Sequence, residues 1–310
     1  MAILFNNHGG DQLRWYEALS AQQLDMPIHI YPDIPNPGDI RYAIVWEHPF
    51  SDLLNYPNLE GILSLGAGME HLLNDPELPD VPLVSLHDPF MSQDMANYAL
   101  YWTIHLQRQL GEYQQQQAAG VWAPLSHVSV SGFNVVLLGL GRIGQKVGQA
   151  LSQSGFPVEA WDFTDKTVEG LSTHAGVDVL DQLLGKADVV ISCLALNTRS
   201  YQLIDEHFLS SMPEGSSLIN VSRGNIIDED ALLSALDSGH IRFAALDVFA
   251  VEPLPVDHAF WSHPRVAVTP HMAGPTPRKT SAAIIIDNIR KMERGETPHL
   301  LFDRQRGRQH

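Results

Sequence analysis

The chain has 310 residues, which is long enough for two domains that each have a core of their own. Its hydrophobic content of 44% and charged content of 18% are typical of a soluble globular protein. A formal net charge of −17 argues against nucleic acid or an anionic membrane as a partner, because both would repel the chain. The single cysteine, Cys193, rules out an internal disulfide and fits a reducing cytoplasm. We expect neither a signal peptide nor a membrane span, since no apolar run reaches ~18 residues.

The first 97 residues show short apolar runs that alternate with turn-rich and helix-patterned stretches. The runs expected to form strands are Ala2–Phe5, Ile28–Ile30, Tyr42–Val45 and Ile62–Leu65. Strands that alternate with helices indicate a parallel sheet. Gly66-Ala67-Gly68-Met69 follows the last of these strands and opens a short predicted helix. The backbone N–H groups of Gly68 and Met69 are therefore candidates to hold a carboxylate, although a plain glycine turn explains these residues equally well.

The rest of the chain alternates more regularly. Met95–Leu110 has apolar residues at helical spacing and predicts a helix that links the two halves. The strands expected after it are Val135–Leu138, Val158–Trp161, Val189–Cys193, Ser217–Val221, Phe243–Leu246 and Val266–Val268. Ser281–Ile289 predicts a late helix that returns the chain to the first half. Both halves are thus predicted to be α/β units with parallel sheets.

Residues 135–144 place a strand, a Gly-x-Gly-x-x-Gly turn and a helix start in the order of a dinucleotide-binding fingerprint. The first glycine allows the tight turn, the second lets the backbone approach a pyrophosphate, and the third lets helix and strand pack closely. The candidate cofactor-binding residues of this loop are Gly139, Leu140, Gly141, Arg142, Ile143 and Gly144. Asp162 ends the next apolar run, where a carboxylate can accept hydrogen bonds from ribose hydroxyls. A glycine turn without a ligand and the first loop of a methyltransferase are the alternatives.

Three chemically active residues follow predicted strands, at the edge of the sheet where this architecture binds ligands. They are Arg223, Glu252 and His271. Taken singly, each could be an ordinary surface residue. Together they suit hydride transfer, because an arginine clamps an α-keto carboxylate and a histidine passes the accompanying proton. A carboxylate beside that histidine orients the ring and favours its charged form.

Five motifs in sequence order resemble those of the D-isomer-specific 2-hydroxyacid dehydrogenase family, over nearly the whole chain. They are Gly66-Ala67-Gly68, Gly139-x-Gly141-x-x-Gly144, Asn220-x-x-Arg223-Gly224, Asp247-Val248-Phe249-x-x-Glu252-Pro253 and Pro270-His271-x-Ala273-Gly274. The resemblance implies that Arg223, Glu252 and His271 are the catalytic residues. It also implies that the substrate carboxylate binds the amides of Gly68 and Met69 as well as Arg223.

The same resemblance implies a fold of two doubly wound parallel-sheet domains. A flavodoxin-like substrate domain would comprise residues 1–97 and 275–310, and a Rossmann coenzyme domain residues 98–274. The further cofactor-binding residues that it implies are Leu194, Ala195, Val221, Ser222, Asp247 and His271. The implied cofactor is NAD or NADP, and no metal site is expected.

Within the family the chain is most similar to the bacterial glyoxylate/hydroxypyruvate reductases. The features concerned are Val45-Trp46, then Tyr98 with Trp102, His105 and Arg108, and the stretch from Glu252-Pro253-Leu254-Pro255 to Trp261-x-His263-Pro264. The implied activity is the NAD(P)H-dependent reduction of a small 2-oxoacid to the D-2-hydroxyacid. Trp46 would then line the substrate pocket, although an ordinary core role for an aromatic residue on a strand explains its presence at least as well.

Some positions depart from the family pattern. Asn97 stands where a glutamate is common, and Ala195 and Asn197 stand in a loop that is usually Pro-Leu-Thr. Asp162 stands where the NADP-using reductases place a serine followed by an arginine. A carboxylate there would repel a 2′-phosphate, so we expect NAD(H) to be preferred. Lys166 or Arg142 could offset that repulsion, which keeps NADP(H) as the alternative.

Two other classes of function remain open at this point. A non-enzymatic NAD(H)-sensing protein could share this fold, and turnover of any 2-oxoacid would exclude it. A methyltransferase would also use a glycine loop, but it has no role for the arginine, glutamate and histidine together. Absorbance change of the nicotinamide without a methyl donor would exclude that class.

We also expect a homodimer. The stretch from Tyr98 to Trp122 belongs cleanly to neither half and is rich in large apolar residues. Its members include Tyr101, Trp102, Ile104, Tyr113, Val121 and Trp122. So much apolar surface is more easily buried against a second copy of the chain than in a monomer.

Overall fold

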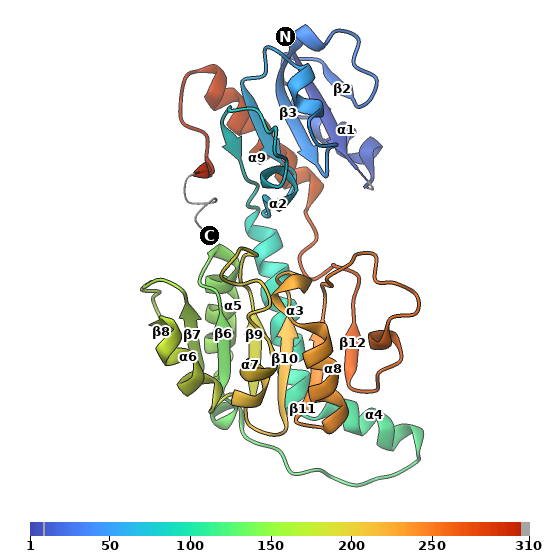
Figure 1. Ribbon diagram of the computed structural model, residues 1–310, viewed down its shortest axis with the longest axis vertical. Coiled ribbons are helices and arrows are strands. Elements are labelled where there is room, and N and C mark those ends of the chain that lie inside the picture. The colour runs from blue at the N-terminus through green and yellow to red at the C-terminus, as the bar shows by residue number, and fades with distance from the viewer. Residues whose placement is uncertain (9, 305–310) are drawn as a thin grey trace. The chain divides into compact units, whose positions relative to one another are not determined.

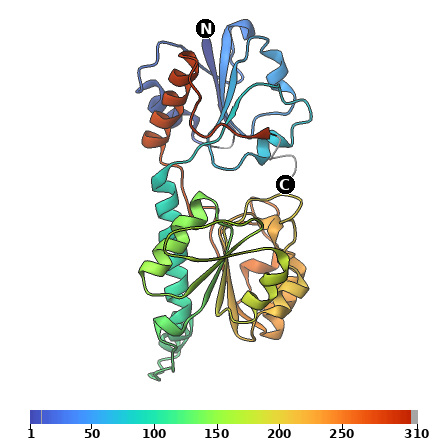
Figure 2. The same ribbon diagram turned by 90° about the vertical axis from the view of Figure 1, so that its left-hand side faces the viewer.

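The computed structural model describes residues 1–8 and 10–304. The chain forms two compact units (Figures 1 and 2). The first unit combines Met1–Met91 with the chain from Thr276 onward, and the second unit is Ser92–Pro275. Both units are α/β with a parallel sheet, which confirms the predicted fold class. The boundary near residue 91 falls inside a single helix, α3 (Pro89–Gln107), which begins in the first unit and continues through the second.

The first unit contains a five-stranded sheet in the order β2-β1-β3-β4-β5. Its strands are β1 (Ala2–Asn7), β2 (Ile28–Ile30), β3 (Ile40–Trp46), β4 (Gly61–Ser64) and β5 (Leu83–Val84). All neighbouring strands pair in parallel. The central strands are buried almost throughout, which is why they appear in the sequence as continuous apolar runs rather than as alternations.

Helices cover both faces of this sheet. α1 (Gln12–Ser20) and α9 (Arg278–Glu293) contact each other and share one core cluster with Phe5, Ile44 and Leu63 of the sheet. α2 (Glu70–Leu73) contributes Leu72 to the cluster on the other face. Since α9 comes from the end of the sequence, its covering of this sheet agrees with the predicted return of the chain (Figure 1).

The second unit contains a seven-stranded sheet in the order β12-β11-β10-β9-β6-β7-β8. Its strands are β6 (Val135–Leu138), β7 (Val158–Asp162), β8 (Ser172–Ala175), β9 (Val189–Ser192), β10 (Ser216–Asn220), β11 (Ile241–Leu246) and β12 (Val266–Val268). All neighbouring strands are again parallel. The sequence order reverses between β6 and β9, and a parallel sheet binds its ligand where the order reverses in this way.

Helices also cover both faces of the second sheet (Figure 2). Helices α3 and α5 (Arg142–Gln153) pack on one face. The other face is covered by α6 (Val177–Leu184), α7 (Glu206–Ser211) and α8 (Glu229–Ser238). Asp205 and Asp228 cap α7 and α8, because their carboxylates accept hydrogen bonds from N–H groups of the first turn.

Three details differ from the sequence-based expectation. β5 and β8 are not predicted, since β5 has only two residues and β8 is a polar edge strand. α3 begins at Pro89 rather than near Met95. α4 (Leu110–Ala118) is a separate helix with no buried residue, and it projects from the rest of the second unit in Figure 1. Among the described residues, no helix is both long enough and apolar enough to cross a membrane.

Candidate active site

A buried asparagine shapes the turn that presents Arg223 in the second unit. Asn220 ends β10, and its side-chain amide donates to the Arg223 carbonyl oxygen at 3.0 Å. Its Oδ1 accepts from the Ser222 N–H at 3.0 Å and from the Ser222 hydroxyl. Ser222 also contacts Ser192 at the end of β9, with 2.8 Å between the two hydroxyl oxygens. The backbone that carries Arg223 is therefore fixed to two neighbouring strands.

Gly224 brings the Arg223 turn against the loop that carries Glu252. A Cβ atom at Gly224 would lie 1.8 Å from the Phe249 carbonyl carbon and 2.2 Å from the Ala250 nitrogen. No side chain fits at that distance, so the close backbone approach requires glycine. The approach places the charge of Arg223 near enough to Glu252 to stabilise its carboxylate.

Glu252 and His271 form a hydrogen-bonded pair. Nδ1 of His271 lies 2.7 Å from Oε2 of Glu252, and Oε1 of Glu252 accepts from the Phe249 N–H at 2.9 Å. Burial opposes ionisation of Glu252, but its bonds with His271 and Phe249 and the charge of Arg223 outweigh burial and lower its pKa. Because the carboxylate occupies Nδ1, Nε2 is the ring nitrogen that remains for exchanging a proton with a substrate. Both side chains are partly exposed, as a substrate would require.

Asp247 holds the loop that carries His271. Its Oδ1 accepts from the Thr269 hydroxyl at 2.6 Å and from the Met272 N–H at 2.9 Å, and its Oδ2 accepts from the Ala273 N–H at 2.8 Å. Its own backbone carbonyl accepts from the His271 N–H at 2.8 Å. His271 has a φ of +51°, a conformation that costs energy for a residue other than glycine. Asp247 is only 1% exposed, so the geometry supports a role in positioning His271.

The glycine loop has the shape that a dinucleotide phosphate requires. A Cβ at Gly139, where φ is +96°, would lie 2.8 Å from the Cys193 carbonyl group. A Cβ at Gly144 would lie 1.9 Å from the Gly139 carbonyl oxygen. A Cβ at Gly141 would have nothing within 4 Å, so the backbone there is open to a ligand. α5 begins directly after Gly141 and directs its unpaired N–H groups toward the same place, which fits a pyrophosphate.

The carboxylate of Asp162 is buried and accepts hydrogen bonds from several neighbouring groups. Its Oδ2 accepts from the Leu140 N–H at 2.8 Å and from Nζ of Lys166 at 2.7 Å, while Oδ1 accepts from the Thr164 N–H at 3.3 Å. Burial opposes its ionisation, but the bonds with Lys166 and Leu140 outweigh burial and lower its pKa. Asp162 thus lies beside the glycine loop, as a ribose-binding residue would, but its charge is already paired.

The other predicted cofactor-binding residues fall into two groups, those with buried side chains and those with exposed ones. Leu140, Leu194, Val221 and Ser222 have buried side chains and can offer a cofactor only their backbone. Arg142 and Ala195 are exposed, and Ile143 is partly exposed. All of them lie in loops or in the first turn of α5 at the carboxyl ends of parallel strands, so the second unit brings the predicted cofactor residues to one edge of its sheet.

The first unit holds the Gly66–Met69 loop through Ser64, the last residue of β4. The Ser64 hydroxyl donates to the Gly68 carbonyl oxygen at 3.4 Å and accepts from the Gly66 N–H at 3.2 Å. In a trans peptide the N–H points opposite to the carbonyl. The bond to the Gly68 carbonyl therefore turns the Met69 N–H away from Ser64, although the Met69 side chain itself is buried.

His71 connects this loop to Trp46. The Glu47 N–H donates to Nδ1 of His71 at 3.2 Å, which leaves Nε2 to donate to the Ser64 hydroxyl at 3.1 Å. The rings of Trp46 and His71 lie 4.5 Å apart. A Cβ at Gly66 would lie 2.4 Å from the Trp46 indole, so the indole covers this glycine. Trp46 is thus packed against the predicted carboxylate-binding loop.

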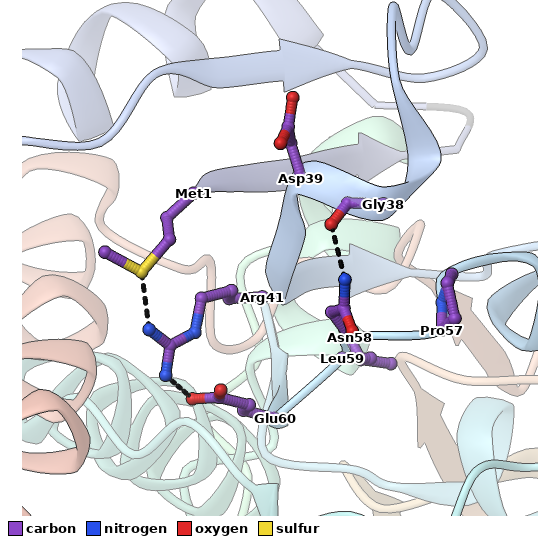
Figure 3. Close-up of a pocket in the computed structure, with 8 residues that line it drawn as sticks. All are labelled: Met1, Gly38, Asp39, Arg41, Pro57, Asn58, Leu59 and Glu60. Atoms are coloured by element: carbon purple, nitrogen blue, oxygen red, sulfur yellow. Dashed lines mark hydrogen bonds and ion pairs between the residues drawn. The ribbon is translucent and has the colours of Figure 1, made fainter.

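A hollow of about 450 Å³ in the first unit lies elsewhere (Figure 3). It is lined by Met1, Gly38, Asp39, Arg41, Pro57, Asn58, Leu59 and Glu60. These residues lie at the amino-terminal ends of β1, β3 and β4, at the opposite edge of the sheet from the Gly66–Met69 loop. Within it, Arg41 contacts Glu60, and Asn58 donates to the Gly38 carbonyl. The hollow is therefore not part of the candidate site.

The second unit alone defines a class of protein. A dinucleotide-type glycine loop, an arginine and a glutamate–histidine pair at one edge of a parallel sheet are the parts of a nicotinamide-dependent oxidoreductase. The family model of the D-isomer specific 2-hydroxyacid dehydrogenase NAD-binding domain matches residues 100–273. The chain belongs to this family, and its cofactor is a nicotinamide dinucleotide, NAD or NADP.

Solved structures agree over the full length. A D-isomer specific 2-hydroxyacid dehydrogenase from Xanthobacter autotrophicus Py2, in complex with NADPH and MES, is 36% identical with a TM-score of 0.94, covering 99% of each chain. An NADPH-dependent glyoxylate/hydroxypyruvate reductase from Sinorhizobium meliloti, with NADP and sulfate, is 27% identical with a TM-score of 0.92. A probable 2-hydroxyacid dehydrogenase from Rhizobium etli CFN 42, with NADP, HEPES and L(+)-tartaric acid, is 27% identical with a TM-score of 0.91. Each of these last two matches covers 99% of this chain and 100% of the other.

Sequence reasoning missed the residues that position the site. Asn220, Ser64 and His71 were not predicted as site residues, although each makes hydrogen bonds that fix a functional loop. The position of Asn220, two residues before Ser222, is a signal that could have been used, because an asparagine side chain often caps the N–H two residues on. Nothing in the spacing of Ser64 and His71 indicates their contact.

Proposed function

We propose that the chain reduces a small 2-oxoacid of the glyoxylate or hydroxypyruvate type to its D-2-hydroxyacid. The observation that carries the proposal is the Glu252–His271 pair with Nε2 left for a substrate, next to the turn that carries Arg223. The likeness to the S. meliloti glyoxylate/hydroxypyruvate reductase supports the substrate class. Small 2-oxoacids differ in few contacts, each worth only ~1–3 kcal/mol, so the choice among them is made by details of the pocket.

The proposed roles follow from the chemistry of each group. A nicotinamide dinucleotide bound at the glycine loop would supply the hydride for the carbonyl carbon. His271 gives the carbonyl oxygen its proton from Nε2, and Glu252 orients the ring through its contact with Nδ1. Arg223 binds the substrate carboxylate and polarises the carbonyl, because its planar guanidinium suits bidentate contacts. The amides of Gly68 and Met69 are assigned to the carboxylate, and Trp46 to the wall of the pocket.

The test is a panel of 2-oxoacids assayed with NADH and with NADPH, followed by the nicotinamide absorbance. We expect turnover of glyoxylate and hydroxypyruvate above that of pyruvate and bulkier oxoacids. Dinucleotide binding without turnover of any 2-oxoacid would favour the NAD(H)-sensing alternative. Turnover confined to bulky oxoacids would exclude the proposed substrate class.

Two arguments about the cofactor point in different directions. Asp162 led to the expectation of NAD(H). The relatives from X. autotrophicus, S. meliloti and R. etli carry NADPH or NADP in their structures, which supports NADP(H) for this chain as well. The pairing of Asp162 with Lys166 weakens the case for NAD(H), since a neutralised carboxylate repels a phosphate less.

We further propose that the protein acts as a homodimer in the cytoplasm. Trp122 is 96% exposed, and Tyr101 and Val121 are more than half exposed. Tyr101 lies on α3, and the other two follow α4, which has no buried residue. A second copy would bury this surface. The single Cys193 suits a reducing compartment. Light scattering at micromolar concentration should give twice the chain mass of 34.4 kDa, and a monomer mass would exclude the dimer.

A further inference from the structure

We infer that Arg199 and Lys166 recognise the 2′-phosphate of NADP(H) and so set the cofactor preference of this chain. The inference rests on the proposed function only in requiring a nicotinamide dinucleotide at the glycine loop. It takes up the NADP(H) alternative rather than the expectation of NAD(H), which gave the carboxylate of Asp162 more weight than the cations near it.

Lys166 stands at the ribose end of the predicted cofactor site. Its Nζ lies 2.7 Å from Oδ2 of Asp162, and the same oxygen accepts from the Leu140 N–H of the glycine loop at 2.8 Å. One carboxylate oxygen thus joins the glycine loop to the lysine. This contact neutralises Asp162 and holds an ammonium group beside the place where the adenosine ribose binds.

Arg199 brings a second cation to the same place from a different segment. It lies on the loop after β9, and its guanidinium carbon is 4.2 Å from the centre of the Phe163 ring. Its Nη2 is 3.5 Å from the Phe163 carbonyl oxygen. Because Phe163 directly follows Asp162, the stacked guanidinium lies at the end of β7. Arg199 is exposed, and no carboxylate of residues 1–8 and 10–304 forms an ion pair with it.

These two cations suit a phosphate better than a ribose hydroxyl. A 2′-phosphate carries up to two negative charges and accepts bidentate bonds from a guanidinium. Stacking on Phe163 holds Arg199 in place before the ligand binds, which lowers the entropy cost of recognition. Asp165 is exposed and opposes the phosphate, but a charge open to solvent is strongly screened. In a chain of net charge −17, the placing of two cations at the end of β7 favours the more anionic cofactor.

The test is the dissociation constant of NADPH and of NADH, measured by fluorescence titration without substrate. We expect the wild type to bind NADPH at least ~10-fold more tightly than NADH. Arg199→Ala should weaken NADPH ~10–100-fold, the effect of losing hydrogen bonds to a charged group, and should change NADH less than ~2-fold. Lys166→Met should also weaken NADPH selectively, because it leaves the Asp162 charge unpaired. Lys186→Ala is the matched control, since it removes an exposed cation that precedes β9 at the amino-terminal edge of the sheet.

A second probe isolates the phosphate. Adenosine 2′-monophosphate should compete with NADPH better than adenosine 5′-monophosphate in the wild type, and this advantage should disappear in Arg199→Ala. Equal weakening of NADH and NADPH by Arg199→Ala, or an equal effect of Lys186→Ala, would overturn the inference while leaving the proposed function intact. A wild type that binds neither dinucleotide would overturn both. Selective NADPH binding without turnover of any 2-oxoacid would support the inference and reject the proposed function.

Discussion

The two sheets share one architecture, but their carboxyl-terminal edges differ in chemistry. In the second unit this edge holds Arg223 and the Glu252–His271 pair, which carry charge and exchange protons. In the first unit the corresponding edge holds the Gly66–Met69 loop with the rings of Trp46 and His71. The edge of the second unit thus carries groups that can respond to charge developing in a reaction. The edge of the first unit instead carries backbone amides and aromatic rings that can contact a substrate.

This difference predicts how variants will behave. A group that interacts more strongly with the transition state than with the ground state changes kcat. A group that binds both states equally changes KM alone. We therefore expect substitutions at the edge of the second unit to lower kcat, and substitutions at the edge of the first unit to raise KM.

The largest effect is expected at His271. His271→Ala removes the proton donor and should lower kcat by ~10²–10⁴-fold, the usual contribution of a positioned acid–base group. The dissociation constant of the cofactor should stay within ~2-fold of the wild type, since the glycine loop is untouched. His174→Ala is the matched control, because His174 pairs with Glu159 at 2.6 Å on the outer strands of the same sheet. A kcat near that of the wild type in His271→Ala would remove His271 from the mechanism.

The next effect is expected at Arg223. Arg223→Lys keeps the positive charge but loses the planar fork, so kcat/KM for glyoxylate should fall ~10–100-fold. Arg265→Lys serves as the control, because Arg265 donates to the Leu236 carbonyl at 2.7 Å within the same unit. Steady-state kinetics with glyoxylate would measure both. An unchanged kcat/KM in Arg223→Lys would mean that a point charge suffices and that the bidentate clamp is wrong.

The fold was largely predictable because burial leaves a strong signal in the sequence. Strands buried on both faces, such as Val135–Leu138 of β6, appear as apolar runs. Asp228 accepts hydrogen bonds at the start of α8, and an aspartate directly before a helical apolar pattern is a recognisable start signal. β8 was missed because an exposed edge strand needs no apolar side chains, and its residues are Ser172–Ala175. The predicted linking helix runs to Leu110, past the break at Gln109 that separates α3 from α4, because a left-handed glutamine has no signature in the sequence.

The candidate site was predictable only in part. Glycine turns and charged residues after strands can be recognised because each sits at a fixed distance from an apolar run. Pairings between distant segments cannot be recognised in that way. Arg199, for example, stacks on Phe163 from a loop more than 30 residues away in sequence. The spacing alone left open whether Lys166 pairs with Asp162, and the structure shows that it does, at 2.7 Å.

A smaller effect is expected at the edge of the first unit. The Ser64 hydroxyl holds the Gly68 carbonyl, and this bond keeps the Met69 N–H turned outward. Ser64→Ala removes that bond. Loss of one neutral hydrogen bond is worth ~1 kcal/mol, so KM for the 2-oxoacid should rise ~5-fold with kcat unchanged. Ser85→Ala is the matched control, since Ser85 lies in the same unit and its hydroxyl also donates to a carbonyl oxygen at 3.4 Å. A fall in kcat without a rise in KM would contradict the division of roles between the two edges.

The smallest effect concerns the stability of the charged edge. The pKa of Glu252 lies below its usual range, because the bonds with His271 and Phe249 outweigh burial. A carboxyl group whose pKa is lower in the folded state stabilises the fold above its unfolded pKa of ~4.3. This stabilisation is lost as the pH falls through the folded pKa. Since the Glu252 side chain is 35% exposed, we expect at most ~1 kcal/mol. Thermal unfolding from pH 3 to pH 7 should show Glu252→Gln less stable than the wild type at pH 7, with the difference shrinking below pH ~4.3. A difference that stays constant with pH would mean that packing, and not the charge of Glu252, is responsible.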